Sequence, residues 1–356
     1  MASVFLRAAR RSSLAQIRYV VPVRPGAGDG LVNRVYDQIE RDFGMLAPPI
    51  ALHSPAPDVL AAAWLMLRET LVATGRVDRP TKEAVGTAVS RGNACPYCVE
   101  VHSATLDGLT GGAGPVADPG RQQVVAWATN CATASSARSL VRVPFPAGHA
   151  AELIGVVVTF HYLNRMVNVF LRESPFPSGL PAPARGGLLR LLVRILRPVT
   201  RAPRRPGEAA DLLPAAAVPE DLVWAAGSPH VVDAFARAAA TVEAAVARWA
   251  SASVRELVRT ELAGWNGEPP GASRAWVSDA VSGLAAADRP AGRLALLTAL
   301  ASYQVSPAVV DDCRDAGLTD EALIELTSWA SLLAARRVGG WTWDSLRSHR
   351  EFSGKP

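Results

Sequence analysis

The chain has 356 residues, of which 49% are hydrophobic and 19% charged, a composition that excludes intrinsic disorder. This length exceeds that of a domain with one ordinary hydrophobic core, so two globular units are expected. Four cysteines are too few for a disulfide-rich secreted scaffold and no apolar run reaches the ~18 residues of a membrane span, so we expect a cytoplasmic protein with reduced thiols. The net charge of +5 is concentrated in residues 1–24 and 185–206, where Arg occurs without acidic residues; the rest is net acidic, which argues against a nucleic-acid partner.

The first 30 residues are predicted to form a basic N-terminal segment that precedes the helical body. Arg18 interrupts the apolar patch of a signal peptide, and no small-residue cleavage site follows it, so secretion is disfavoured. After the Pro- and Gly-rich stretch at 22–30, apolar residues recur at spacings of three and four, which is typical of amphipathic helices. No alternating strand pair is found, and an all-α fold is predicted, with helices near 81–92, 96–109, 119–137, 148–171, 229–250, 253–264, 272–287, 289–303, 305–314 and 319–338.

Residues 81–103 contain the cluster of side chains that points to chemistry. Pro96 suits the first turn of a helix, so Cys95 is expected at its start and Cys98 one turn in. His102 follows these cysteines by seven and four residues, which puts all three side chains on one helix face. A helix N-terminus favours a thiolate, paired thiols can form a disulfide, and a neighbouring His can take the thiol proton. A redox site with a depressed thiol pKa is predicted.

Two other interpretations of the cysteine pair fit the sequence less well. A structural zinc site needs four ligands, but the remaining cysteines, Cys131 and Cys313, are single and far apart in the sequence. A pair of merely buried cysteines explains the thiols but neither Pro96 nor the aligned His102. We therefore expect no metal, and we expect Cys131 and Cys313 to be small core residues.

The segment resembles the active-site motif of the alkyl hydroperoxidase D-like proteins, in the carboxymuconolactone decarboxylase superfamily. In that motif a Glu is followed twelve residues later by Cys-x-x-Cys, with a His four residues beyond the second Cys. Glu83, Cys95, Cys98 and His102 meet this spacing. Many members have a His directly before the second Cys. This chain has Tyr97 there, and other branches of the superfamily also have a Tyr, in the pattern Cys-x-Tyr-Cys. Including the helix at 149–171, the resemblance covers about residues 35–171.

The resemblance implies a helical bundle and a peroxidase cycle. Cys98 would attack a hydroperoxide to give a sulfenic acid, Cys95 would resolve it as a disulfide, and a dithiol protein or small thiol would reduce that disulfide. Glu83 would act as a base through His102, while Tyr97 would orient this relay or line the pocket. The other polar side chains near the motif, His149, Glu152 and His161, are expected to be supporting or solvated. No phosphate-binding Gly loop or flavin motif occurs, so no bound cofactor is expected.

Residues 174–218 are predicted to be a Pro- and Arg-rich linker between helical units at 31–173 and 219–345, with a tail at 346–356. Its prolines argue against a continuous helix. Within it, leucines alternate with arginines in a short basic amphipathic helix, inside the basic stretch 185–206. This stripe would suit an anionic membrane surface, but docking on a neighbouring domain is the expected arrangement.

The second unit shows a faint internal repeat of the first. Ser54-Pro55 and Lys82-Glu83 compare with Ser228-Pro229 and Arg255-Glu256, at offsets of 174 and 173 residues. Carrying the second offset forward places Glu268, Gly271 and Ala275 opposite the two thiols and the histidine, so this copy lacks the chemistry. Superfamily members assemble from copies of a small helical unit. The second unit is therefore expected to be a degenerate scaffold that walls the first unit's pocket, and the protein a homo-oligomer.

Three functions remain open at this point. The first is a thiol-dependent peroxidase acting on hydroperoxides. The second is a non-catalytic redox sensor, in which disulfide formation changes the binding of a partner. The third is decarboxylation of a carboxymuconolactone-like acid, which the cysteine pair argues against because that branch generally lacks it. Repeated turnover of peroxide with a reductant separates an enzyme from a sensor.

Overall fold

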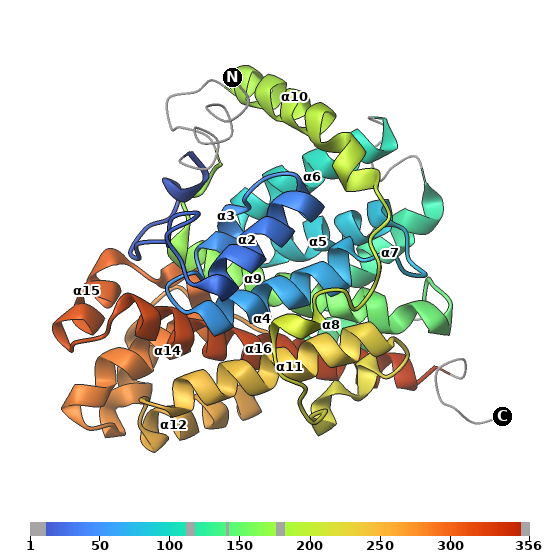
Figure 1. The fold of residues 1–356 in the computed structure, drawn as a ribbon. Coiled ribbons are helices and arrows are strands. Elements are labelled where there is room, and N and C mark those ends of the chain that lie inside the picture. The colour runs from blue at the N-terminus through green and yellow to red at the C-terminus, as the bar shows by residue number, and fades with distance from the viewer. Residues whose placement is uncertain (1–11, 112–117, 140–141, 176–181, 350–356) are drawn as a thin grey trace.

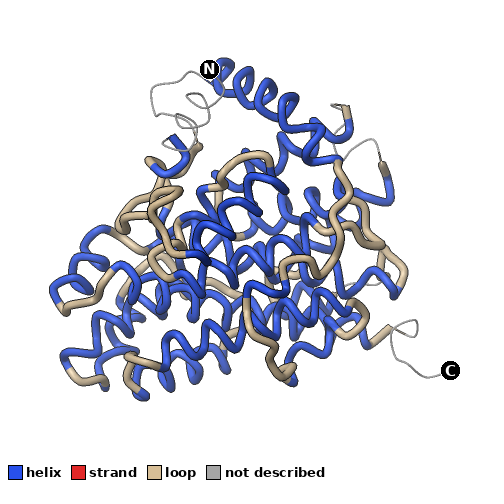
Figure 2. Tube along the Cα trace, viewed as in Figure 1, coloured by secondary structure: helices blue, strands red, loops and turns tan. Residues whose placement is uncertain are grey.

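The computed structural model describes residues 12–111, 118–139, 142–175 and 182–349. Much of the predicted basic N-terminal segment and of the tail lies outside these ranges. Within them every regular element is a helix, and the one extended pairing is a bridge between Ile17 and Leu171, so the all-α prediction is confirmed (Figure 2). The α-helices are α2 (Gly30–Phe43), α3 (Pro48–Ala51), α4 (Pro57–Leu67), α5 (Arg79–Gly92), α6 (Pro96–Thr110), α7 (Pro119–Asn130), α8 (Ala134–Arg138), α9 (Ala150–Phe170), α10 (Ala182–Arg201), α11 (Pro229–Ala247), α12 (Ala252–Gly264), α13 (Ala275–Ala280), α14 (Arg289–Ala301), α15 (Pro307–Asp315) and α16 (Asp320–Arg347).

Side-chain caps explain why several helices begin where the sequence predicts. Asp29 accepts from the backbone N–H of Val32 at α2, and Asp78 accepts from that of Thr81 at α5. Ser251 and Thr319 cap α12 and α16 in the same way. The predicted helices at 81–92, 253–264 and 319–338 begin at these caps, and α16 continues beyond 338 to Arg347. Those at 96–109 and 229–250 begin without a side-chain cap, with Pro96 and Pro229 in the first turn.

Three predicted segments are wrong in detail. The helix predicted over 119–137 is interrupted, because Thr133 accepts a hydrogen bond from the backbone N–H of Ser136 and starts α8 anew. The segment predicted over 272–287 contains only the short α13 and two 3₁₀ turns, Val281–Gly283 and Ala286–Asp288. The predicted linker contains a helix of twenty residues, α10. Pro183 lies in the first turn, where proline is tolerated, whereas Pro198 lies inside the helix and removes one backbone hydrogen bond.

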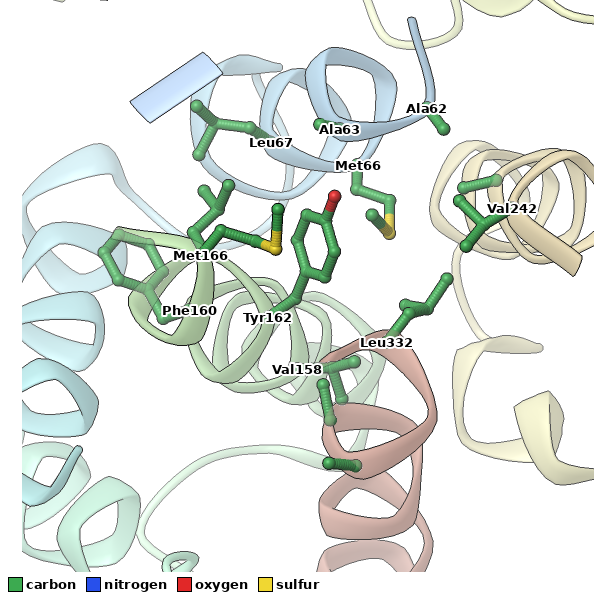
Figure 3. Close-up of a cluster of buried hydrophobic side chains, with 14 of the residues drawn as sticks. Ala62, Ala63, Met66, Leu67, Val158, Phe160, Tyr162, Met166, Val242 and Leu332 are labelled. Carbon is green, nitrogen blue, oxygen red and sulfur yellow. The ribbon is translucent and has the colours of Figure 1, made fainter. Parts of the chain in front are cut away.

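The core helix of the molecule is α9, which all but completely buries its 21 residues. Among the described residues one helix, Ala147–Phe170, is long and apolar enough to span a membrane, and 94% of its apolar window is buried inside the protein. One face of α9 packs on α5, and the other on α16, while α4 packs on α11. Figure 3 shows side chains of these helices meeting, with Met66, Tyr162, Val242 and Leu332 among them.

The helices that the proposed repeat relates lie against each other, because α4 contacts α11 and α9 contacts α16. Two copies of one unit related by a two-fold axis would pair in this way. The alignment fails beyond α12, however, since residues 265–274 form a loop and not a helix start. The left-handed backbone at Gly267 and Gly271, with φ of 100° and 97°, breaks the helix there. The division into two units stays a prediction, and one buried apolar cluster runs through both.

Candidate active site

A tight turn between α5 and α6 delivers Cys95 to the start of α6. The backbone N–H of Cys95 donates to Ser90 O at 2.9 Å, and that of Ala94 donates to Arg91 O at 3.1 Å. This pair of bonds is a Schellman motif, which ends a helix with one residue in the left-handed region. Ala94 occupies that position with φ of 49°. The turn therefore joins the two site helices at the expense of backbone strain.

Replacing Ala94 by Gly is expected to raise the free energy of unfolding by ~0.5–1 kcal/mol, because the left-handed strain of Ala exceeds the extra chain entropy of Gly. Urea unfolding of the full chain measures the change. Ala240→Gly, at an exposed position inside α11, is the matched control and should instead lose ~1 kcal/mol. Destabilisation of both variants to the same extent would contradict the strain argument.

Cys95 and Cys98 are free, buried and in contact with each other. The hydrogen bond between the thiols raises the pKa of Cys98 well above its usual value, and burial raises it further. The Asn164 side chain, from α9, hydrogen-bonds Cys98 and opposes this shift. The expected depression of the thiol pKa is therefore wrong for this reduced arrangement. Burial and the second thiol outweigh the favourable helix N-terminus.

Glu83 and His102 form a buried dyad across α5 and α6. The Nδ1 atom of His102 lies 2.6 Å from Glu83 Oε2, and Arg79 Nε donates to Glu83 Oε1 at 2.7 Å. Glu83 is fully buried, which by itself raises its pKa, but the charges of Arg79 and His102 outweigh burial and lower it. The carboxylate is therefore ionised at neutral pH and accepts from Nδ1–H of His102.

Aromatic rings fix the position of the dyad. The rings of His102 and Phe160 meet edge to face with centroids 4.7 Å apart. Phe160 approaches closely because α5 has Gly86 there, where a Cβ atom would lie 2.4 Å from Phe160 Cζ. Tyr97 is buried and its hydroxyl donates to Gln16 Oε1 at 2.8 Å. Burial raises the pKa of this hydroxyl, so Tyr97 stays protonated.

A cavity of about 360 Å³ brings these residues together. Cys98, Tyr97, His102 and Arg79 line it, whereas Cys95 does not and lies behind Cys98. Within the part of the chain that the structure describes, no hydrogen bond joins His102 to Cys98. His102 and the thiol therefore line one pocket, in which a substrate or a water would bridge them.

One wall of the cavity is the helix inside the predicted linker. In Figure 1 α10 lies across the top of the molecule beside α6, and it contacts α6 and α2. Its inward side supplies Leu189, Leu192, Val193 and Leu196 to the cavity. The amphipathic stripe thus docks on the neighbouring part of the protein.

The other polar residues singled out in the sequence do not line the cavity. Glu152 lies 3.0 Å from Lys82 Nζ and accepts from the backbone N–H of Arg76. His161 is buried beside Arg165, whose NH1 atom donates to the carbonyl of His161. His149 lies in a 3₁₀ turn, Ala147–His149. Cys131 and Cys313 are both buried. Among the described residues, no group of three or more His, Cys, Asp or Glu side chains is arranged to hold a metal ion.

Sequence reasoning missed two contributors to the site. Arg79 precedes Glu83 by four residues, a spacing that predicts an ion pair on one helix face and was available in the sequence. Asn164 comes from a helix more than sixty residues away, and its amide also donates to Ser90 Oγ at 3.0 Å. No local signal relates Asn164 to the thiols.

Comparison with known proteins adds two findings. Residues 58–109 match the model described as the carboxymuconolactone decarboxylase family. This range extends from α4 to α6 and includes the dyad and both thiols. A protein named alkyl hydroperoxide reductase Rv2159c, from Mycobacterium tuberculosis, is 35% identical over 338 residues, which cover 91% of this chain and 94% of that protein.

Proposed function

Because the chain belongs to the carboxymuconolactone decarboxylase family, in its alkyl hydroperoxidase D-like branch, we propose that it is a thiol-dependent peroxidase that reduces organic hydroperoxides. The observation that supports this most is the layered arrangement at the pocket. Cys98 faces the cavity and Cys95 lies in contact behind it. The name of the mycobacterial relative agrees with this activity.

The proposed cycle uses the two thiols of the protein, Cys98 and Cys95, and two thiol groups of a reductant. The Cys98 sulfur attacks one peroxide oxygen, an S–O bond forms and the O–O bond breaks, so the thiol becomes a sulfenic acid and the hydroperoxide an alcohol. Cys95 then attacks the Cys98 sulfur, the disulfide forms and water leaves. A dithiol protein or small thiol reduces the disulfide by exchange and is itself oxidised. Peroxide is thus reduced by two electrons in each turn.

The dyad supplies the proton transfer that this cycle needs. Since the pKa of Cys98 is raised, the resting sulfur is a thiol and must lose its proton when peroxide binds. Nε2 of His102 is the base for that proton, and Glu83 holds the ring in the required tautomer. The proton then passes to the alkoxide that leaves.

Alkylation of Cys98 by iodoacetamide is expected to be slow at pH 7 and to accelerate as the pH rises beyond 9, because the raised pKa leaves little thiolate at neutral pH. Mass spectrometry of the modified peptide follows the rate. Cys95→Ala removes the hydrogen bond that raises the pKa most, so it should shift the profile to lower pH. An unchanged profile in Cys95→Ala would contradict the assigned cause.

Turnover tests the function itself. The reduced protein is mixed with an excess of tert-butyl hydroperoxide and dithiothreitol, and the peroxide that remains is titrated. A peroxidase consumes many equivalents and accumulates a Cys95–Cys98 disulfide when dithiothreitol is withheld. Consumption that stops at one equivalent, with the reductant present, would instead indicate a redox sensor.

A further inference from the structure

We propose that the substrate is a fatty-acid hydroperoxide, whose acyl chain lies in the Cys98 cavity under α10 and whose carboxylate binds Arg197 at the rim. This inference rests on the proposed peroxidase function and specifies the chemical class of its substrate. Four features of the cavity support this substrate class: its size, the wall formed by α10, the position of Arg197 at its rim, and the positive charge of that rim.

The cavity is larger and more apolar than a small peroxide requires. Its 360 Å³ correspond to about a dozen water-sized volumes, of which hydrogen peroxide fills two. Phe43, Met45, Leu67, Leu109 and Leu163 line it together with the inward leucines of α10. A chain on the order of ten carbons would fill this space and bury apolar surface along its length.

Two glycines allow α10 to form a close-fitting wall. A Cβ atom on Gly108 would lie 2.0 Å from Val193 Cγ1, and one on Gly44 would lie 2.8 Å from Leu196 Cδ2. Gly108 is in the interior of α6, where Gly weakens a helix, so its small size serves the contact with α10. The approach brings the inward leucines into the cavity that Cys98 also lines.

The chain that follows α10 is fastened to a buried ionic cluster. Arg201 donates to Leu109 O at 2.8 Å, and the backbones of Thr74 and Arg204 are joined at 2.9 Å. Arg68, fully buried, donates to Glu208 at 2.6 Å and to Asp42 at 2.8 Å. The C-terminal end of the wall is thereby held in place, which makes the cavity a built feature of the fold.

The rim of the cavity is positively charged. A second cavity of about 840 Å³ lies between α6 and α10 and shares Gly108, Leu189, Val193 and Arg197 with the first. Among the described residues that line it, Arg185, Arg190 and Arg194 are basic, and Glu100 and Asp107 are acidic. The Nε of Arg197 is buried and has no hydrogen-bond partner among the described residues.

Arg197 therefore lies where an apolar cavity meets a basic one. A guanidinium in this position suits a carboxylate. In a fatty-acid hydroperoxide the –OOH group is on the chain, away from the carboxylate, so it can reach Cys98 while the acid group stays at the rim. Cys98 is oxidised to the sulfenic acid and the lipid is reduced to the hydroxy acid, which leaves with the thiol proton.

Reaction and binding are tested separately. Single-turnover oxidation of Cys98 is measured with linoleic acid hydroperoxide, its methyl ester and tert-butyl hydroperoxide. Binding is measured by calorimetry with linoleate, which has no peroxide group to react. We expect oxidation by the long-chain acid to be faster than by tert-butyl hydroperoxide, and we expect linoleate to bind the reduced protein at one site.

Variants test whether α10 causes the preference for a long chain and whether Arg197 causes the preference for a free acid. Leu192→Gln places a polar group in the cavity and should lower the preference for the long chain over tert-butyl hydroperoxide about tenfold. Leu191→Gln, on the outward side of the same helix, is the matched control and should keep that preference. Arg197→Gln should lower the preference for the free acid over the methyl ester about tenfold.

The outcomes distinguish this inference from the function on which it rests. Equal rates with all three peroxides would overturn the substrate class and leave the peroxidase intact. Binding of linoleate without oxidation of Cys98 by any peroxide would overturn the peroxidase and leave a fatty-acid site. Equal effects of the Leu191 and Leu192 variants would overturn the role of α10.

Discussion

Peroxide consumption is expected to fall by several orders of magnitude when Cys98 is replaced by Ser, because a serine hydroxyl has neither the acidity nor the nucleophilicity of the thiol. Of the four cysteines, Cys98 is the one that lines the cavity, so no other thiol can take its place. The buried Cys131 offers a control, since Cys131→Ser should retain activity. Both are compared in the tert-butyl hydroperoxide assay with dithiothreitol present.

The companion variant, Cys95→Ser, distinguishes the thiol that attacks the peroxide from the thiol that later forms the disulfide. It should react with one equivalent of hydroperoxide and stop at a Cys98 sulfenic acid, which a dimedone adduct on that residue reports by mass spectrometry. An active Cys98→Ser protein, or a sulfenic acid found on Cys95 in place of Cys98, would reverse the assignment.

Glu83→Gln is expected to slow oxidation of Cys98 by ~10²–10⁴-fold, the range of general-base contributions. Glutamine fits the same space but offers an NH₂ group to Nδ1 of His102, which moves the ring proton to Nε2 and removes the base. The rate is measured under single-turnover conditions with saturating peroxide. Glu152→Gln also replaces a buried carboxylate beside a cation, but outside the cavity, and should reduce stability without slowing oxidation. Equal rates in Glu83→Gln and wild type would contradict the relay.

The same substitution has a consequence for acid stability. The pKa of Glu83 is lowered from 4.5 in the folded protein, so its ionisation stabilises the fold above pH 4.5. That contribution is lost as the pH falls through the folded pKa, when the carboxyl takes up a proton. Thermal unfolding between pH 3 and 7 should therefore show a shallower acid decline in Glu83→Gln than in wild type.

Local signals predicted most of the fold. Side-chain caps such as Asp78 and Thr319 and the apolar spacing of three and four are properties of neighbouring residues, which is why many helices lie within a few residues of prediction. The motif follows in part, since Cys98 and His102 are four residues apart on α6 and both line the cavity, whereas Cys95 is the N-cap residue and does not line it. The predictions that were wrong concern properties that depend on tertiary contacts.

The failures share that physical cause. The pKa of Cys98 is set by burial and the partner thiol, against the helix N-terminus that the sequence displays. The continuous α10 is stabilised by packing on Gly44 and Gly108, which lie far away in the sequence. The register of the second unit is lost where Gly267 and Gly271 turn the chain. None of these could be derived from a window of neighbouring residues.

The contact between α9 and α16 has a consequence for how the site behaves on dilution. Phe160 and Asn164, on α9, touch the dyad and the thiol, while α16 covers the opposite face of that helix. Both helices belong to one chain, so this support does not depend on an encounter between molecules. The packing behind the thiol and the dyad is therefore expected to persist on dilution, whereas an assembly of separate small units would dissociate into incomplete sites.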